Sequence, residues 1–203
     1  MCGRGHVCSG GEASVCEPLS EVVASARAAV AALDPAALTG TQASAFFEAG
    51  AELERLGAAI KVLVAPKIAL SETWARAGHR SPEEWMARTS GTSVGQAKAT
   101  VETGKRLEAL SDTASALKSG ALSLPQAAAV AEGAASDPDA ESKLLETAAA
   151  ESLKVLQDKS RRVVLDARGS VEERYTRQRK IRDFSSWTDD EGMTSGRFRL
   201  TPE

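Results

Sequence analysis

The stretch from Arg76 to Leu110 has the sequence RAGHRSPEEWMARTSGTSVGQAKATVETGKRLEAL. A first helix start is indicated at Ser81, because a serine hydroxyl can accept the backbone N–H three residues later while Glu84 reaches back toward the start of the helix. Pro82 occupies the first helical position, where the missing N–H of proline costs nothing. The pattern predicts a helix that begins at residue 82.

A second helix start follows at Ser93, with Gln96 in the corresponding position. Gly91 lies between the two helices and can adopt the positive φ that ends a helix. Two capped helices joined by so short a turn have the layout of a helix-turn-helix, which proteins use to present a helix to DNA. On this interpretation Gln96 reads adenine, Lys98 reads guanine or phosphate, and the recognition surface comprises Thr92, Gln96, Lys98, Thr100 and Thr103. The alternative is two helices packed in a bundle with their polar residues in water.

Four segments carry a family resemblance: GHRSPEEWMARTSGTS (78–93), GKRLEAL (104–110), KSGALSLPQAAAVAEGAA (118–135) and RKIRDFSSWTDDEGMTSGRFRLTPE (179–203). Together they resemble the actinobacterial domain of unknown function 222, over a length from about Leu33 to the C-terminus. The resemblance implies a helical module that usually precedes an HNH endonuclease domain.

The nuclease chemistry itself is not predicted for this chain. An HNH site needs a histidine base and further His, Asn or Asp groups around a metal ion. The sequence contains only His6 and His79, and neither lies in such a pattern. No Ser/His/Asp or Cys/His set can be assembled, so we predict no catalytic residues and no cofactor. The three cysteines, Cys2, Cys8 and Cys16, match no common zinc spacing, and we predict free thiols and no metal.

Composition and length suit a helical protein. The chain has 203 residues and few aromatic ones, 4 % in all, which favours closely packed helices over a β-sandwich. No apolar run approaches the length of a membrane span, and the N-terminus lacks a hydrophobic signal core. These features predict a soluble cytoplasmic protein without a membrane partner.

The charge is distributed unevenly along the chain. Residues 154–182 contain ten basic and four acidic side chains, a local charge of +6, whereas the rest of the chain carries −9. A basic block in an acidic protein indicates a local contact with a polyanion. The predicted DNA-binding residues in this block are Arg161, Arg162, Arg174, Arg177, Arg179, Lys180 and Arg182. The alternative is a solvated helix that connects two domains.

The remaining sequence predicts an all-α fold: a multi-helix bundle around one long kinked helix, with a small C-terminal β-hairpin. The first helix is expected to be capped by Ser20. The long helix is expected to begin at Thr41 and, if it continues through Ala77, to be about 55 Å long, with a kink at Pro66. Ser111 is expected to cap a later short helix. The hairpin strands are expected within 184–187 and 196–200.

The predicted organisation is a disordered leader (1–16), a helical domain (17–168), and a basic helix plus hairpin (169–203) leading toward a missing C-terminal domain. The predicted function is DNA binding or positioning by a non-catalytic, HNH-endonuclease-associated module. The alternative is a protein–protein interaction module, with self-association as a homodimer, that binds no nucleic acid.

Overall fold

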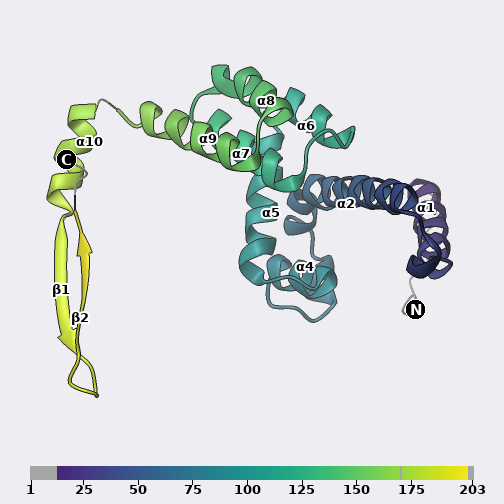
Figure 1. The fold of residues 1–203 in the computed structure, drawn as a ribbon, viewed down its shortest axis with the longest axis horizontal. Helices are drawn as coiled ribbons and strands as arrows, with labels where there is room; N and C mark the ends of the chain where they lie inside the picture. Colours follow the sequence, from purple (N-terminus) through teal and green to yellow (C-terminus); the bar gives the residue numbers. More distant parts are fainter. Residues whose placement is uncertain (1–12, 170, 201–203) are drawn as a thin grey trace. The chain divides into compact units, whose positions relative to one another are not determined.

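The computed structural model describes residues 13–169 and 171–200, which are helical except for a C-terminal β-hairpin (Figure 1). This confirms the predicted all-α class with a terminal hairpin. Contacts between residues divide the chain into two units, Met1–Gly50 and Ala51–Glu203. The boundary falls inside a helix, at a place where the sequence contains no break.

The first unit contains helix α1 (Ala13–Ala31), the 3-10 turn η1 (Pro35–Ala37) and the start of helix α2 (Gly40–Ala69). The helix α1 already includes residues 13–16, and Ser20 lies inside it and does not cap it. The helix α2 begins at Gly40, one residue before the predicted start at Thr41. Thr39 precedes it: its N–H donates to Gln42 Oε1 at 3.0 Å, and its hydroxyl accepts the Gln42 N–H at 3.3 Å.

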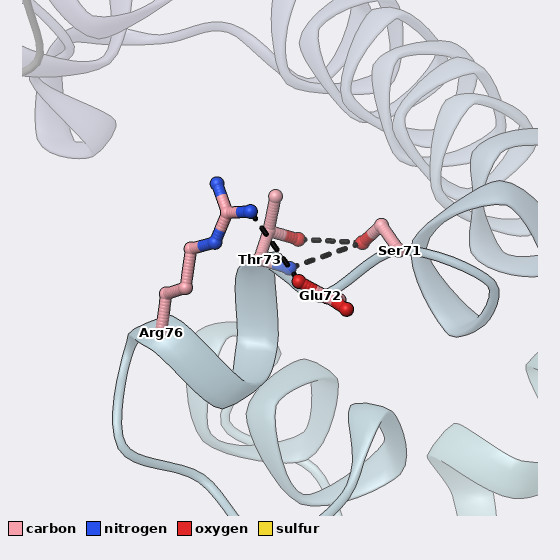
Figure 2. Close-up of polar contacts among 4 residues, drawn as sticks. All are labelled: Ser71, Glu72, Thr73 and Arg76. Carbon is pink, nitrogen blue, oxygen red and sulfur yellow. Dashed lines mark hydrogen bonds and ion pairs between the residues drawn. The ribbon is translucent and has the colours of Figure 1, made fainter.

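The second unit begins with the C-terminal part of α2, which continues through Pro66 to Ala69 and not to Ala77. The helix ends where Ser71 Oγ donates to the Ile68 carbonyl at 2.8 Å. Ser71 also bonds the Thr73 hydroxyl at 2.7 Å and accepts its N–H, and this contact starts the short helix α3 (Thr73–Arg76; Figure 2). The hydroxyl of Ser71 thus forms hydrogen bonds between α2 and α3, which are two helices and not the single helix through Ala77 that the sequence analysis allowed.

The rest of the second unit consists of short helices followed by the hairpin. Their bounds are α4 (Pro82–Ser90), α5 (Val94–Leu107), α6 (Ser111–Lys118), α7 (Leu124–Ala134), η2 (Pro138–Ala140), α8 (Glu141–Ala150), α9 (Leu153–Ala167), α10 (Val171–Lys180), β1 (Asp183–Thr188) and β2 (Thr194–Arg199). None of the helices in residues 13–169 and 171–200 is both long and apolar enough to cross a bilayer.

The helix α7 packs against α5, α6, α8 and α9. It can contact so many neighbours because its buried positions carry small side chains, among them Ala127, Ala131 and Ala134, around the fully buried Val130. Gly133 allows the closest approach, since a Cβ there would lie 2.6 Å from Leu144 Cδ1 and 3.0 Å from Ser160 Oγ. The main core is therefore built around an alanine-rich helix, and α2 contributes Ala59 and Val62 to it.

The helix α6 is capped from a distance. The sequence analysis expected Ser111 to cap this helix, and that prediction is wrong. The N-cap position is Leu110, which offers no side-chain acceptor. Instead Glu141 Oε1 accepts both the N–H of Thr113, at 2.9 Å, and its hydroxyl, at 2.6 Å. A side chain in the first turn of α8 thereby accepts a hydrogen bond from a backbone N–H in the first turn of α6.

The hairpin is antiparallel and pairs Phe184 with Phe198 and Trp187 with Ser195. Its turn is closed by the Asp189 carboxylate, which accepts the N–H of Glu191 at 3.1 Å and of Met193 at 2.8 Å. Both faces of the hairpin are largely exposed, and Phe184 and Phe198 are 72 % and 69 % accessible.

Candidate nucleic-acid interface

Two adjacent arginines of α9, both predicted to contact DNA, lie in opposite electrostatic surroundings. Arg161 forms an ion pair with Asp158 at 3.4 Å and lines a depression that also contains Glu102 and Glu132. The exposed ion pair contributes little free energy. The carboxylates of Asp158, Glu102 and Glu132 nevertheless offset the charges of Arg161 and Arg106, with Glu102 also paired to Lys105 at 3.4 Å. Arg161 is therefore poorly placed to attract a phosphate.

Arg162 points toward a basic depression between α8 and α9. The depression has a volume of about 430 Å³ and is lined by Lys143, Lys159 and Arg162, with Glu146 as its only acidic residue among the described ones. Lys159 Nζ donates to Thr147 Oγ1 at 3.1 Å, which holds the ammonium group over the α8 surface. Two well-packed helices thus bring three cations together beside one carboxylate.

We call Lys143, Lys159 and Arg162 the basic cluster. Lys143 lies outside the basic block that the sequence analysis singled out, and it was missed for that reason. Its spacing of four residues places it on the same face of α8 as Thr147, but no signal in the sequence brings that face to α9. Three cations that line one depression can hold a phosphate by charge and hydrogen bonds.

The C-terminal elements carry a second group of cations. Arg179 and Lys180 end α10, Arg182 precedes β1, and all three are exposed. The side chains of Arg174 and Arg177, also predicted to bind DNA, lie outside the described residues. The sequence analysis missed Arg197 and Arg199, which alternate with Phe198 along β2.

The register of the hairpin places Arg197 and Arg199 on one face, together with Trp187. Arg197 lies opposite Ser185, and Arg199 lies opposite Asp183. Trp187 shares this face because side chains two residues apart along a strand point the same way. An exposed indole beside two guanidinium groups can stack on a base while the cations contact phosphates.

The predicted helix pair forms as expected in its local geometry. The Ser81 hydroxyl accepts the Glu84 N–H at 3.2 Å, and Gly91 ends α4 with a φ of 66°. A complete capping box joins Ser93 and Gln96, with bonds of 3.1 and 3.0 Å. The Glu84 carboxylate differs from the expected pattern, since it accepts the N–H of Arg80 and not that of Ser81.

Gln96 and Lys98, the two predicted base-reading residues, differ in position. Both are exposed. The Gln96 side chain lines a groove shared with α2 and α7, and its Oε1 is engaged by the cap. Lys98 does not line that groove. The two side chains therefore do not form one protruding surface of the kind that enters a major groove.

No group of three or more His, Cys, Asp or Glu residues with a metal-binding geometry occurs in the described part of the chain. Cys2, His6 and Cys8 lie outside it. His79 is half-buried next to the start of α4. The Asp189 carboxylate, in the acidic turn of the hairpin, is engaged by backbone N–H groups.

Comparisons of the chain with protein-family models, curated proteins and solved structures found no match. The fold and the surface define a helical protein with a basic cluster on its packed body. The resemblance to the family of domain 222 stays a prediction from the four sequence segments quoted above.

Proposed function

We propose that this chain is a non-catalytic module that binds the backbone of DNA through its cations. The observation that carries the proposal is the basic cluster, in which Lys143, Lys159 and Arg162 surround a depression with a single carboxylate. Contacts of this type give affinity and salt dependence without sequence preference. The resemblance to a module that precedes HNH endonucleases supports a role in positioning DNA for such a nuclease.

The exposed cations at the end of α10 and on β2 provide a second set of contacts. Arg179, Lys180 and Arg182 were predicted from the sequence, and Arg197 and Arg199 extend the set. Trp187 adds an aromatic surface for an unpaired base. In this proposal the helix pair α4–α5 serves mainly as a packed structural element, and Lys98 adds a peripheral phosphate contact.

The test is fluorescence anisotropy of a labelled DNA duplex titrated with the protein at two salt concentrations, about 50 mM and about 200 mM. We expect binding that weakens steeply at the higher concentration. Absence of binding at low salt, or binding indifferent to salt, refutes the proposal.

Self-association is the second candidate function, and the surface of the first unit favours it. On α1, Leu19, Val22, Val23 and Val30 follow helical spacing and are exposed. On α2, Phe47 is 78 % accessible. Apolar helix faces of this size commonly mark interaction surfaces.

Sedimentation equilibrium distinguishes the two candidates. A dimer that Val30→Ser and Phe47→Ser convert to a monomer supports self-association. If those monomeric variants still bind DNA as tightly as the unsubstituted chain, self-association is not needed for the proposed DNA contact.

A further inference from the structure

A groove of about 490 Å³ lies within the second unit, between the C-terminal part of α2, the helices α4 and α5, and the start of α7. This volume falls in the range of sites that bind small molecules. The groove is separate from the basic cluster, which α8 and α9 form.

The walls of the groove are apolar. Val64 and Ile68 come from α2, Trp85 and Met86 from α4, and Leu124 from α7. Leaving such surface in water is unfavourable, and Val64 is 43 % accessible. An apolar molecule in the groove would remove this surface from water.

One side of the groove is polar. Gln96 and Thr100 are four residues apart and share one face of α5, and Thr92, in the turn before α5, also lines the groove. The Thr100 hydroxyl already donates to the Gln96 carbonyl at 3.0 Å, and Gln96 Oε1 accepts hydrogen bonds from Ser93. The threonine hydroxyls and the Gln96 Nε2 group are neutral and can form hydrogen bonds with a polar atom of a ligand.

Among the described residues that line the groove, Lys61 is the one charged side chain. No Asp or Glu is among the described residues of the lining, and no ion pair of Lys61 is found within residues 13–169 and 171–200. Lys61 is exposed, so its ammonium group lies in water at the edge of the apolar walls, where its charge favours an anionic group over a neutral or cationic one. Lys61 lies seven residues before Ile68 on α2, so the ammonium-bearing position and the far apolar end are about 10 Å apart along the helix.

We propose that this groove binds an elongated small molecule with an apolar body and one terminal carboxylate, of the kind that a medium-chain fatty acid represents. The carboxylate pairs with Lys61, and the chain lies along Val64 and Ile68 against the Trp85 ring. The site is independent of the proposed DNA contact, since none of these residues belongs to the basic cluster.

The experiment uses the fluorescence of Trp85 in a Trp74→Phe, Trp187→Phe background. Trp74 can be replaced without loss of a hydrogen bond, because its buried Nε1 has no partner in the described structure. The protein is titrated with decanoate below its micelle concentration, and calorimetry provides the stoichiometry. We expect saturable binding of one decanoate per chain, and weaker binding of decyltrimethylammonium, which has the same chain and the opposite charge.

Three variants make the test specific. Lys61→Gln is expected to weaken decanoate binding roughly tenfold, as the loss of one charge-assisted contact does. Lys67→Gln, an exposed position of the same helix outside the groove, is expected to leave binding unchanged. Ala128→Leu, which fills the groove from a half-buried position of α7, is expected to abolish binding, and circular dichroism checks that it remains folded.

Three outcomes overturn the proposal. The first is no saturable binding of decanoate. The second is equal binding of the cationic analogue, which would show apolar adsorption alone. The third concerns the variants: either the Lys61 and Lys67 substitutions have an equal effect, or a folded Ala128→Leu variant binds decanoate fully. Either result would place the ligand elsewhere.

Discussion

Gly104 of α5 packs directly against Pro66 of α2. A Cβ at Gly104 would lie 2.8 Å from the Pro66 ring carbons and would overlap the Val62 carbonyl oxygen. Pro66 has no N–H, so the Val62 carbonyl lacks its usual helical donor. Because Gly104 has no side chain, α5 can pack directly against the Val62 carbonyl. The close packing of the two helices therefore depends on both Gly104 and Pro66.

The first prediction concerns this contact. Gly104→Ala is expected to lower the free energy of unfolding by about 2 kcal/mol, because the backbone of α2 cannot move aside as a side chain could. Gly57→Ala in α2 is the control: nothing lies within 4 Å of its added Cβ, and it is expected to stabilise the protein by about 0.5 kcal/mol. Urea denaturation measures both, and equal effects would contradict the proposed role of Gly104.

The second prediction concerns the cap that α8 provides to α6. Glu141→Ala removes the acceptor for both the N–H and the hydroxyl of the buried Thr113. A loss of about 2 kcal/mol in the free energy of unfolding is expected. Glu146→Ala, an exposed change on the same helix, is expected to stay within about 0.5 kcal/mol. A Glu141→Ala variant as stable as the control would show that water replaces the cap.

The third prediction separates two capping boxes that look alike in sequence. In α7, Gln126 accepts the Ser123 N–H at 2.9 Å and also donates from Nε2 to the Ala148 carbonyl at 2.9 Å. Gln126→Glu keeps the acceptor, but it removes the donor and places a carboxylate beside that carbonyl. A destabilisation of about 1 to 3 kcal/mol is expected at neutral pH.

Gln96→Glu is the matched control, because Gln96 forms the same box in α5 and its side chain makes no hydrogen bond to a second helix within the described residues. A carboxylate near a helix N-terminus is favourable, so this change is expected to be neutral or to stabilise the protein by about 0.5 kcal/mol. Thermal denaturation of the two variants tests the difference. Similar melting temperatures would mean that the Ala148 contact contributes nothing.

The fourth prediction concerns DNA binding and compares neighbouring arginines. Arg162→Gln is expected to reduce the slope of log affinity against log salt by about one unit, as the loss of one phosphate contact does. Arg161→Gln removes the same charge from the same helix, but from a depression whose lining cations and carboxylates balance, and it is expected to leave the slope unchanged. Anisotropy titrations at several salt concentrations provide both slopes. If both substitutions change the slope equally, net charge and not the basic cluster governs binding.

Local signals in the sequence predicted much of the fold. The starts of α4 and α5 could be predicted because their capping hydrogen bonds join residues only three apart, so both partners appear in one short sequence pattern. The glycine between the two helices was recognised from the same local pattern. The hairpin was predicted from its turn residues for the same reason. The end of α2 was missed, because the sequence analysis allowed the helix to continue through Ala77, whereas the hydroxyl of Ser71 forms bonds where the helix ends.

Features that depend on contacts distant in sequence could not be predicted. The cap of α6 comes from Glu141, 28 residues away, and nothing in the sequence near Ser111 indicates it. The basic cluster combines α8 with α9, so a count of charges along the chain could not find Lys143. The contrast between Arg161 and Arg162 arises because adjacent helical residues point about 100° apart, Arg161 toward a depression whose charges balance and Arg162 toward one with a net positive charge.

The alanine-rich helix α7 has a consequence for how this protein tolerates change. Four neighbouring helices lie against side chains that contain a single methyl group, so an added methylene at Ala127, Ala131 or Ala134 would push on several of them at once. The positions least tolerant of a larger side chain are thus the small alanines of α7, whereas the large apolar residues of α1 are exposed, so a substitution there creates no clash in this core.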